Sequence, residues 1–287
     1  MIEDLIYDVG MHQGKDTEFY LRKGFRVVAI EANPELAQVV RNRLSTDVES
    51  GRLTILELAI TDRAGLADFF VATEEDFLSS LFEESLPPWS ARKRIQVKCE
   101  TFDAILREHG IPYYLKIDIE GADISCIRKL RDAQTKPQYV SFECSTNGFE
   151  SAFECLAELY TMGYRRFKLV NGARIIERKC PNPPREGKYV DMKFDGHSSG
   201  PFGEETAGQW LAVEEIVEKC LQLGKQQAMR KVYIANGRVM GIPLQRYHGL
   251  VKTIYNAHIV KMFRRGYCAL LRREIGGWFD IHARYGG

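Results

Sequence analysis

The sequence lacks the features that mark a membrane-spanning, secreted or nucleic-acid-binding protein. No apolar run approaches the roughly 18 residues that a spanning helix needs. Residues 1–5 lead directly into an apparent strand, without the basic and then apolar stretch of a signal peptide. The charges nearly cancel, with 40 Lys and Arg against 39 Asp and Glu, so no global field favours a nucleic acid. We therefore expect a cytoplasmic protein with no membrane span and no nucleic-acid partner.

Paired cysteines are also lacking. The chain has seven cysteines, an odd number, and none forms a C-x-x-C pair. This pattern argues against a disulfide framework or a zinc site and favours a reducing compartment. Hydrophobic residues make up 45% of the 287 residues, which is enough for a full buried core. A core of about 200 residues with an appended C-terminal segment fits this length best.

Strand-like and helix-like segments alternate through the first half of the chain. Such alternation predicts a Rossmann-like α/β fold, in which a mostly parallel, twisted sheet carries helices on both faces. Ligands bind to such a sheet at the carboxyl ends of its strands. The expected strands cover residues 5–9, 25–30, 53–58, 66–71, 113–117 and 139–142, and the expected helices cover residues 14–23, 34–44, 123–130 and 149–162.

The alternation fades after about Asn171, which suggests two parts of the chain. We expect residues 1–175 to form the core, with residues 73–94 as a polar insertion or lid. Residues 176–287 are interpreted as an extension of helices and loops that packs on the core and helps to form the acceptor site. Its expected helices cover residues 212–223 and 255–273, and its segments 200–203 and 278–282 are candidates for completing the pocket.

A glycine loop follows the first expected strand. Its spacing from Gly10 to Gly14 is G-x-x-x-G, unlike the G-x-G-x-x-G loop that brings amides onto a pyrophosphate. Asp8, just before the turn, could bind or orient an ammonium group. Glu31 ends the second strand, where a carboxylate can accept hydrogen bonds from both hydroxyls of a ribose. The combination suits S-adenosylmethionine, which has no phosphate, although an ordinary strand–helix turn is the alternative.

The most specific string in the chain is K-I-D-I-E-G, which begins at Lys116. Because strand side chains alternate, Lys116, Asp118 and Glu120 are expected to project to the same side. Three ionisable groups on one face are costly unless they are paired or functional. They are therefore candidates for the chemistry of the site. The alternative is that Lys116 and Glu120 form a structural ion pair.

These motifs together resemble those of the FkbM-type methyltransferase family, over roughly residues 5–170. The shared features are the acid–apolar–glycine loop at 8–10, the acid in a Glu-Pro-like context at 31–34, the Ser-Ser-Leu stretch at 79–81, the string at 116–121 and Glu143 near the end of the next strand. The resemblance implies a class I methyltransferase fold, S-adenosylmethionine as donor and usually O-methylation. Hydroxyls of polyketides and sugars are among the acceptors it implies, so it leaves the substrate open.

The expected site residues come from the loop, the strand ends and the resemblance. Asp118 and Glu120 are the first candidates for the base that an alcohol acceptor needs, with Lys116 supporting them and His197 as the runner-up. The residues expected to bind the cofactor are Asp8, Gly10, Met11, His12, Gly14, Thr17, Glu31, Ala32, Ala59, Ile60, Ser80 and Asp118.

A divalent metal is considered as a second cofactor. Asp118 and Glu143 end neighbouring strands and Asn147 follows, so their oxygens could hold Mg²⁺. No local spacing of metal ligands is present, so metal-free chemistry is favoured and no metal-binding residue is predicted.

The function predicted from the sequence is S-adenosylmethionine-dependent O-methylation of a carbohydrate, a lipid-linked sugar or a secondary metabolite, by a protein that could form homo-oligomers. An NAD-dependent oxidoreductase is the first alternative, but the glycine spacing and the 116–121 string argue against it. A non-catalytic nucleoside-binding protein is the second. The intact acids and glycines of the expected site argue against that, although a fold alone does not prove activity.

Overall fold

The computed structural model describes residues 1–73, 79–86, 90–119, 121–144, 149–235, 238–239, 242–243 and 278–286. From residue 226 to residue 243 it describes the backbone alone. Three expectations fall outside these residues: the helix at 255–273, the candidate base Glu120 and the candidate metal ligand Asn147.

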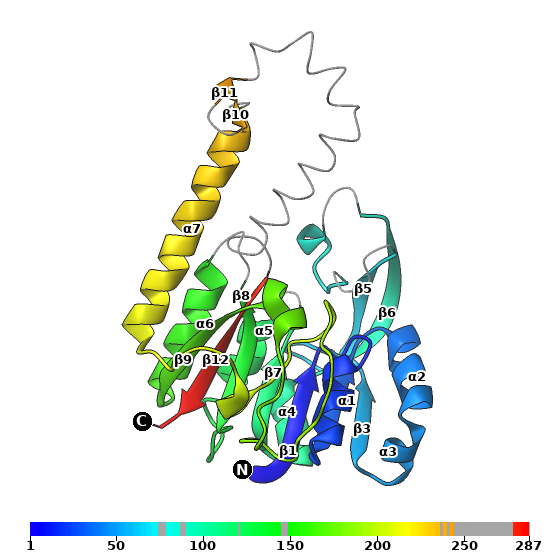
Figure 1. Ribbon diagram of the computed structural model, residues 1–287. Coiled ribbons are helices and arrows are strands. Elements are labelled where there is room, and N and C mark those ends of the chain that lie inside the picture. The colour runs from blue at the N-terminus through cyan, green and yellow to red at the C-terminus, as the bar shows by residue number, and fades with distance from the viewer. Residues whose placement is uncertain are drawn as a thin grey trace.

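Seven strands of the described chain form the central sheet (Figure 1), in the order β3-β2-β1-β7-β8-β12-β9. The first five strands in this order are parallel, and β12 runs antiparallel to both of its neighbours. The strand order reverses between β1 and β7, which is where open α/β sheets bind ligands. The strands are β1 (Ile2–Val9), β2 (Arg26–Glu31), β3 (Leu53–Glu57), β7 (Pro112–Ile117), β8 (Tyr139–Cys144), β9 (Tyr164–Asn171) and β12 (Phe279–Tyr285).

Helices cover both faces of this sheet. In β1, Tyr7 packs into one buried cluster and Ile6 into another, so the two clusters lie on opposite faces. Residues of α4 to α7 build the first cluster, whereas α1, α2 and the segment 175–202 build the second. The helices are α1 (Lys15–Arg22), α2 (Pro34–Arg43), α3 (Ser45–Glu49), α4 (Phe102–His109), α5 (Asp123–Lys129), α6 (Glu150–Thr161) and α7 (Val213–Ala235).

The start of α2 shows how the local sequence sets an element. The side chain of Asn33 accepts a hydrogen bond from the backbone N–H of Glu35 at 3.0 Å, and Pro34 occupies the first helical position. Proline fits there because that N–H has no partner inside the helix. The helix begins where the sequence predicts, immediately after the strand that carries Glu31.

Smaller elements complete the described chain. A second sheet of described strands has the order β4-β6-β5 and stands beside the central one. Its strands are β4 (Ala59–Ile60), β5 (Gly65–Ala72) and β6 (Arg92–Glu100); the remaining elements are the hairpin β10 (Arg238–Val239) and β11 (Ile242–Pro243) and the 3-10 helices η2 (Glu83–Ser85), η3 (Gly172–Glu177) and η4 (Gly203–Glu205).

The mostly parallel sheet with helices on both faces confirms the expected fold class. Each strand and helix expected before residue 171 is present, with bounds that shift by a few residues. The sequence analysis missed β6, α4, β9 and β12. In β6 charged residues break the apolar pattern. In β12 polar residues alternate with apolar ones, as in a strand exposed on one face, yet both faces are buried.

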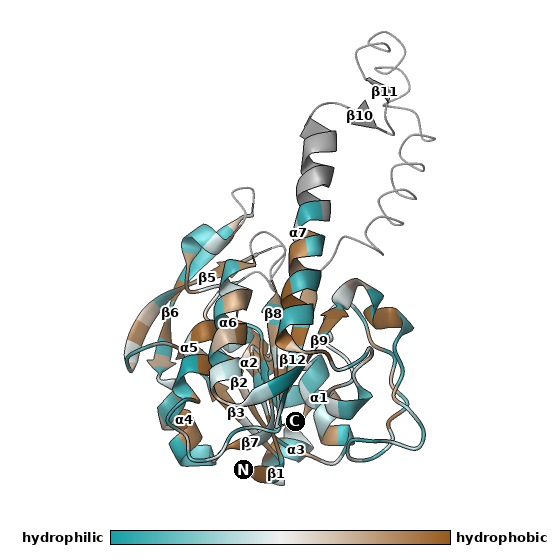
Figure 2. Cartoon of the chain, turned by 90° about the vertical axis from the view of Figure 1, so that its left-hand side faces the viewer, coloured by the Kyte–Doolittle hydropathy of each residue, from teal (hydrophilic) through white to brown (hydrophobic). Residues whose placement is uncertain are grey.

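The C-terminal extension differs in one respect from the expected appendage of helices and loops. Its last strand, β12, lies inside the sheet between β8 and β9, as the red arrow in Figure 1 shows. The helix expected at 212–223 is the longer α7, which rises away from the body of the molecule (Figure 2). The division of the chain at residue 175 stays a prediction, but the extension supplies a core strand.

The segment 172–212, between β9 and α7, packs against the core through aromatic contacts and one buried ion pair. The ring of Phe202 stacks on Tyr114 with centroids 4.6 Å apart and planes 5° apart. Nearby, the ammonium of Lys23 lies 2.8 Å from the carboxylate of Glu205, and both side chains are fully buried. The expectation that residues 200–203 complete the pocket is wrong for Phe202, whose ring belongs to the core.

Phe202→Ala is expected to destabilise the protein by about 3–5 kcal/mol, because the variant loses a fully buried aromatic ring and leaves a cavity. Denaturant unfolding followed by circular dichroism measures the change. Leu66→Ala, at a side chain that is 71% exposed, is the matched control and should change stability by less than about 0.5 kcal/mol. Equal effects of the two substitutions would contradict the role given to Phe202.

Candidate functional site

A cavity of about 640 Å³ opens at the carboxyl ends of the central strands. Its walls come from the loops after β1, β2 and β7, from β4 and from residues 79–85 of the expected insertion. Residues 196–199 and Trp278 close it on the side of the C-terminal extension. The volume lies within the range of pockets that bind small molecules and cofactors. Trp278 belongs to the segment 278–282 that was expected to complete the pocket, and that role stays a prediction.

Gly10 lets the loop after β1 approach β7 closely. Its φ is +86°, and a Cβ built there would lie 1.8 Å from the carbonyl oxygen of Asp118. No side chain fits that gap, so only glycine allows this contact. The backbone N–H groups of Gly10 and Met11 both donate to the carbonyl of Ile30 at 3.0 Å. The loop is thereby fixed between β2 and β7 as part of the cavity wall.

Glu31 presents a carboxylate to the cavity from the end of β2. Its side chain accepts hydrogen bonds from the backbone N–H groups of His12 and Asn33, each at 2.8 Å. The residue is only 8% exposed, and this burial raises the pKa of Glu31 to about 7, although the two hydrogen bonds favour the charged form. The carboxylate is therefore held in one orientation, with lone pairs left for the donors of a ligand.

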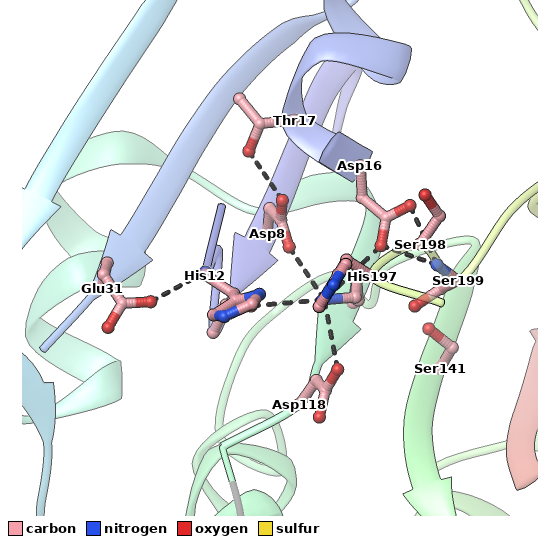
Figure 3. A network of polar contacts seen from close by, with 12 residues as sticks. Asp8, His12, Asp16, Thr17, Glu31, Asp118, Ser141, His197, Ser198 and Ser199 are labelled. Carbon is pink, nitrogen blue, oxygen red and sulfur yellow. Dashed lines mark hydrogen bonds and ion pairs between the residues drawn. The ribbon is translucent and has the colours of Figure 1, made fainter. Parts of the chain in front are cut away.

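Lys116 is the centre of a buried network of charges (Figure 3). Its ammonium lies 3.2 Å from Asp8, 3.7 Å from Asp16 and 3.5 Å from Asp118. Burial alone would lower the pKa of Lys116, but the three carboxylates raise it well above the ordinary value. The Thr17 hydroxyl donates to Asp8 at 2.6 Å. One lysine thus joins carboxylates from β1, α1 and the end of β7 beneath the cavity.

Asp16 ties the C-terminal extension to this network. Both of its carboxylate oxygens accept from the backbone N–H of Ser199, at 3.0 and 2.9 Å. Burial raises the pKa of Asp16 to about 6, while the charge of Lys116 opposes that shift. The anchored loop places His197 at the cavity, where its ring centroid lies 5.4 Å from that of His12. Figure 3 shows the two rings beside each other.

The structure brings most of the expected site residues to one cavity. Those that line it are Gly10, Met11, His12, Glu31, Ala32, Ala59, Ile60, Lys116, Asp118 and His197. Glu120 and Asn147 lie outside the described residues. Among the expected pair of serines, Ser79 lines the cavity whereas Ser80 is buried beside it.

Three expected cofactor contacts lie behind the cavity wall. Asp8 and Thr17 are fully buried and bond to each other, and Asp8 also accepts a hydrogen bond from Lys116, which lines the cavity. Gly14 precedes α1 and packs against Val40. A ligand contact for these three residues stays a prediction.

Sequence reasoning missed Asp16 and Ser199. An acid in the first turn of a helix is common, because it favours the positive end of the helix dipole, and Asp16 therefore gave no distinct signal. Its contact with Ser199 spans 183 residues of sequence, and no local pattern indicates such a pairing.

Two further features are absent from the described part of the chain. Its His, Cys, Asp and Glu side chains form no group of three that could hold a metal ion. Within the same residues, no helix has both the length and the apolar character that crossing a bilayer requires. The use of Mg²⁺ stays open.

The comparison with known protein families decides the identity of the domain. The model of the methyltransferase FkbM domain matches residues 8–166, which is more than half of the chain. The chain belongs to the FkbM methyltransferase family. This membership, which the sequence motifs suggested, supports methyl transfer that depends on S-adenosylmethionine. The matched region contains the glycine loop, Glu31 and Asp118.

Solved structures resemble this FkbM-family chain only distantly. Precorrin-6y C5,15-methyltransferase from Geobacter metallireducens is 15% identical, with 60% of this chain and 69% of that chain covered and a TM-score of 0.33. An S-adenosylmethionine-dependent O-methyltransferase from Thermotoga maritima is 16% identical, with 58% and 46% covered and a TM-score of 0.34. Likeness at this level carries no argument about function. No curated protein matches the chain.

Lys116→Met is expected to lower the free energy of unfolding by about 3–5 kcal/mol near neutral pH, since it leaves buried carboxylates without their cation. Asp16, which Lys116 keeps charged against the effect of burial, would then have to take up a proton to stay buried. The loss should therefore be larger at about pH 8 than at about pH 5, where protonation is less costly. Denaturant unfolding at both pH values tests this.

The matched control for this experiment is Lys15→Met. Lys15 lies 3.7 Å from Asp195, and both side chains are substantially exposed, so its removal should cost less than about 1 kcal/mol. A loss for Lys116→Met that is the same at both pH values would show that the buried carboxylates do not depend on the lysine.

Proposed function

We propose that the protein is an S-adenosylmethionine-dependent O-methyltransferase that acts on a hydroxyl of a carbohydrate, a lipid-linked sugar or a secondary metabolite. The observation that carries the proposal is Glu31, a buried carboxylate at the end of β2 that faces a cavity with no phosphate-binding glycine loop. Such a carboxylate suits the two hydroxyls of a ribose. A cytoplasmic location and a homo-oligomeric state stay predictions.

The charges around the cavity fit a cationic donor. The described lining residues include one lysine, Lys116, and five acids: Asp16, Glu31, Asp118, Asp123 and Glu143. S-adenosylmethionine carries a sulfonium and an ammonium against one carboxylate, so its net charge is positive. A pyrophosphate would instead bring negative charge to an acidic wall, which disfavours a dinucleotide cofactor.

The donor supplies a methyl group that its sulfonium already activates, so the protein contributes chiefly position and proton transfer. Residues 196–199 form part of the cavity wall and would reduce the contact of a bound ligand with water. Asp118 is the candidate that takes the acceptor's hydroxyl proton, because its carboxylate lines the cavity and remains partly exposed. Lys116 orients that carboxylate from 3.5 Å. His197, on the same cavity, is the alternative base.

Glu31→Ala is expected to weaken the binding of S-adenosylhomocysteine on the order of 10- to 100-fold, because hydrogen bonds to a charged group contribute about 1.5–3 kcal/mol. Titration calorimetry measures the affinity. With the pKa of Glu31 at about 7, the wild-type affinity should rise between about pH 6 and pH 8, as the carboxylate loses its proton, and the variant should lack this rise.

Glu57→Ala is the matched control for Glu31. Glu57 ends the neighbouring strand β3 in register with Glu31, but its side chain is exposed and lies outside the cavity. Its replacement should leave the affinity unchanged. Wild-type protein that binds NAD and not S-adenosylhomocysteine, or a Glu31→Ala variant with full affinity, would refute the proposal.

Asp118→Asn is expected to lower the turnover number by about 10²- to 10⁴-fold on any acceptor that the wild-type protein methylates, since general bases contribute on this scale. Asparagine keeps the shape of the side chain but cannot take up the proton. Affinity for S-adenosylhomocysteine should fall much less than turnover. If turnover were retained in Asp118→Asn and lost in His197→Asn, the base would be His197.

A further inference from the structure

A row of three carboxyl groups crosses neighbouring strands at the end of the cavity farther from Glu31. Glu143 of β8 pairs in antiparallel register with Asp280 of β12. Lys116 of β7 pairs with Ser141, so Asp118, two residues further on, lies next to Glu143. Because residues two apart share a face of a strand, the three acids face the same side of the sheet. Asp118 and Glu143 line the cavity.

Asp280 is the unexplained member of this row. It is 7% exposed, and its Oδ2 atom has no hydrogen-bond partner among the described residues. Its neighbours Phe279 and Ile281 belong to the hydrophobic cluster on the opposite face, so the carboxyl projects to the face that carries Lys116. Trp278, two residues before it, lines the cavity. Buried polar groups rarely lack a partner, so this carboxyl indicates a place for a ligand's polar group or for water.

The surroundings of Asp280 are acidic on balance. Among the described residues, Asp118, Asp16 and Glu143 lie near it, from the end of β7, from α1 and from β8, and the nearby cations are Lys116 and Arg178. Lys116 is already shared among three carboxylates. Burial raises the pKa of Asp280 to about 8, and the negative charge of Asp118 is the second largest cause of this rise. The negative charges beside Asp280, whose effect on its pKa adds to that of burial, would also oppose the entry of an anion.

We propose that Asp118, Glu143 and Asp280 form the acceptor subsite, and that Asp280 sets its specificity: the subsite takes an uncharged, hydroxyl-rich acceptor and rejects the counterpart that bears a carboxylate. This inference rests on the proposed function. Hydroxyl groups can hydrogen-bond to these carboxyl groups in either protonation state, because a hydroxyl donates to a carboxylate and accepts from a protonated carboxyl. The carboxylate of an acidic ligand can only accept hydrogen bonds. Its negative charge also adds to that of the acids that Lys116 does not fully neutralise.

The test uses two probes that share one ring, methyl glucoside and methyl glucuronide. Their binding to protein saturated with S-adenosylhomocysteine is followed by ligand-observed NMR at about pH 9, above the pKa of Asp280. Wild-type protein is expected to bind the glucoside more tightly. In Asp280→Asn this preference should shrink on the order of tenfold, the effect of removing one nearby unit charge at an effective dielectric constant of about 20.

His282→Asn is the matched control, because His282 is also buried on the same strand and face as Asp280 but lies two residues farther from Trp278, which lines the cavity, and pairs with Ser141. It should leave the preference unchanged. Tighter or equal binding of the glucuronide by wild-type protein, no binding of either probe, or an unchanged preference in Asp280→Asn would each overturn the inference. Failure of the wild-type protein to bind S-adenosylhomocysteine would instead refute the proposed function.

Discussion

The site depends on a single buried ammonium group. Lys116 lies among Asp8, Asp16 and Asp118, which come from a strand, a helix and a strand end, and its Nζ also lies 3.3 Å from the carbonyl of Gly10. Charges are costly in a protein interior unless they are paired. Moving these elements apart would leave buried charges unpaired, so the pairing stabilises their arrangement. The glycine loop, the start of α1 and the end of β7 are thus held in one arrangement by electrostatics and not by apolar packing alone.

One lysine does not neutralise all the acids around the cavity. Burial raises the pKa values of Glu31 and Asp280 to about 7 and about 8, so both carboxyls are poised to change charge near neutral pH. A cationic ligand would favour their ionised forms, and an anionic ligand would oppose them. Under the proposed function, methyl transfer removes the positive charge of the sulfonium. The product is then less attracted to the acidic wall than the donor was, which favours exchange.

The sequence predicted what local patterns encode. Alternation in the string at Lys116 placed Lys116 and Asp118 on one side, and the Asn33-Pro34 pair located the start of α2. What it could not show depends on contacts between distant segments. The insertion of β12 between β8 and β9 and the bond from Ser199 to Asp16 join residues far apart in the chain. Asp280 was missed as a site residue for the same reason, because only the pairing of β12 reveals its neighbours.

Residues from two parts of the chain lie at the cavity. Gly10, Glu31 and Asp118 lie inside the region that matches the family model, residues 8–166. His197, Trp278 and the adjoining Asp280 lie beyond it, in the C-terminal extension. The extension is nevertheless part of the same folded unit, because β12 belongs to the central sheet and Asp16 anchors the loop at Ser199. Under the proposed function, Glu31, which would hold the donor's ribose, therefore lies in the part that matches the family model. Asp280, the residue proposed to set acceptor specificity, lies in the extension, and only the pairing of β12 with β8 brings it to the cavity.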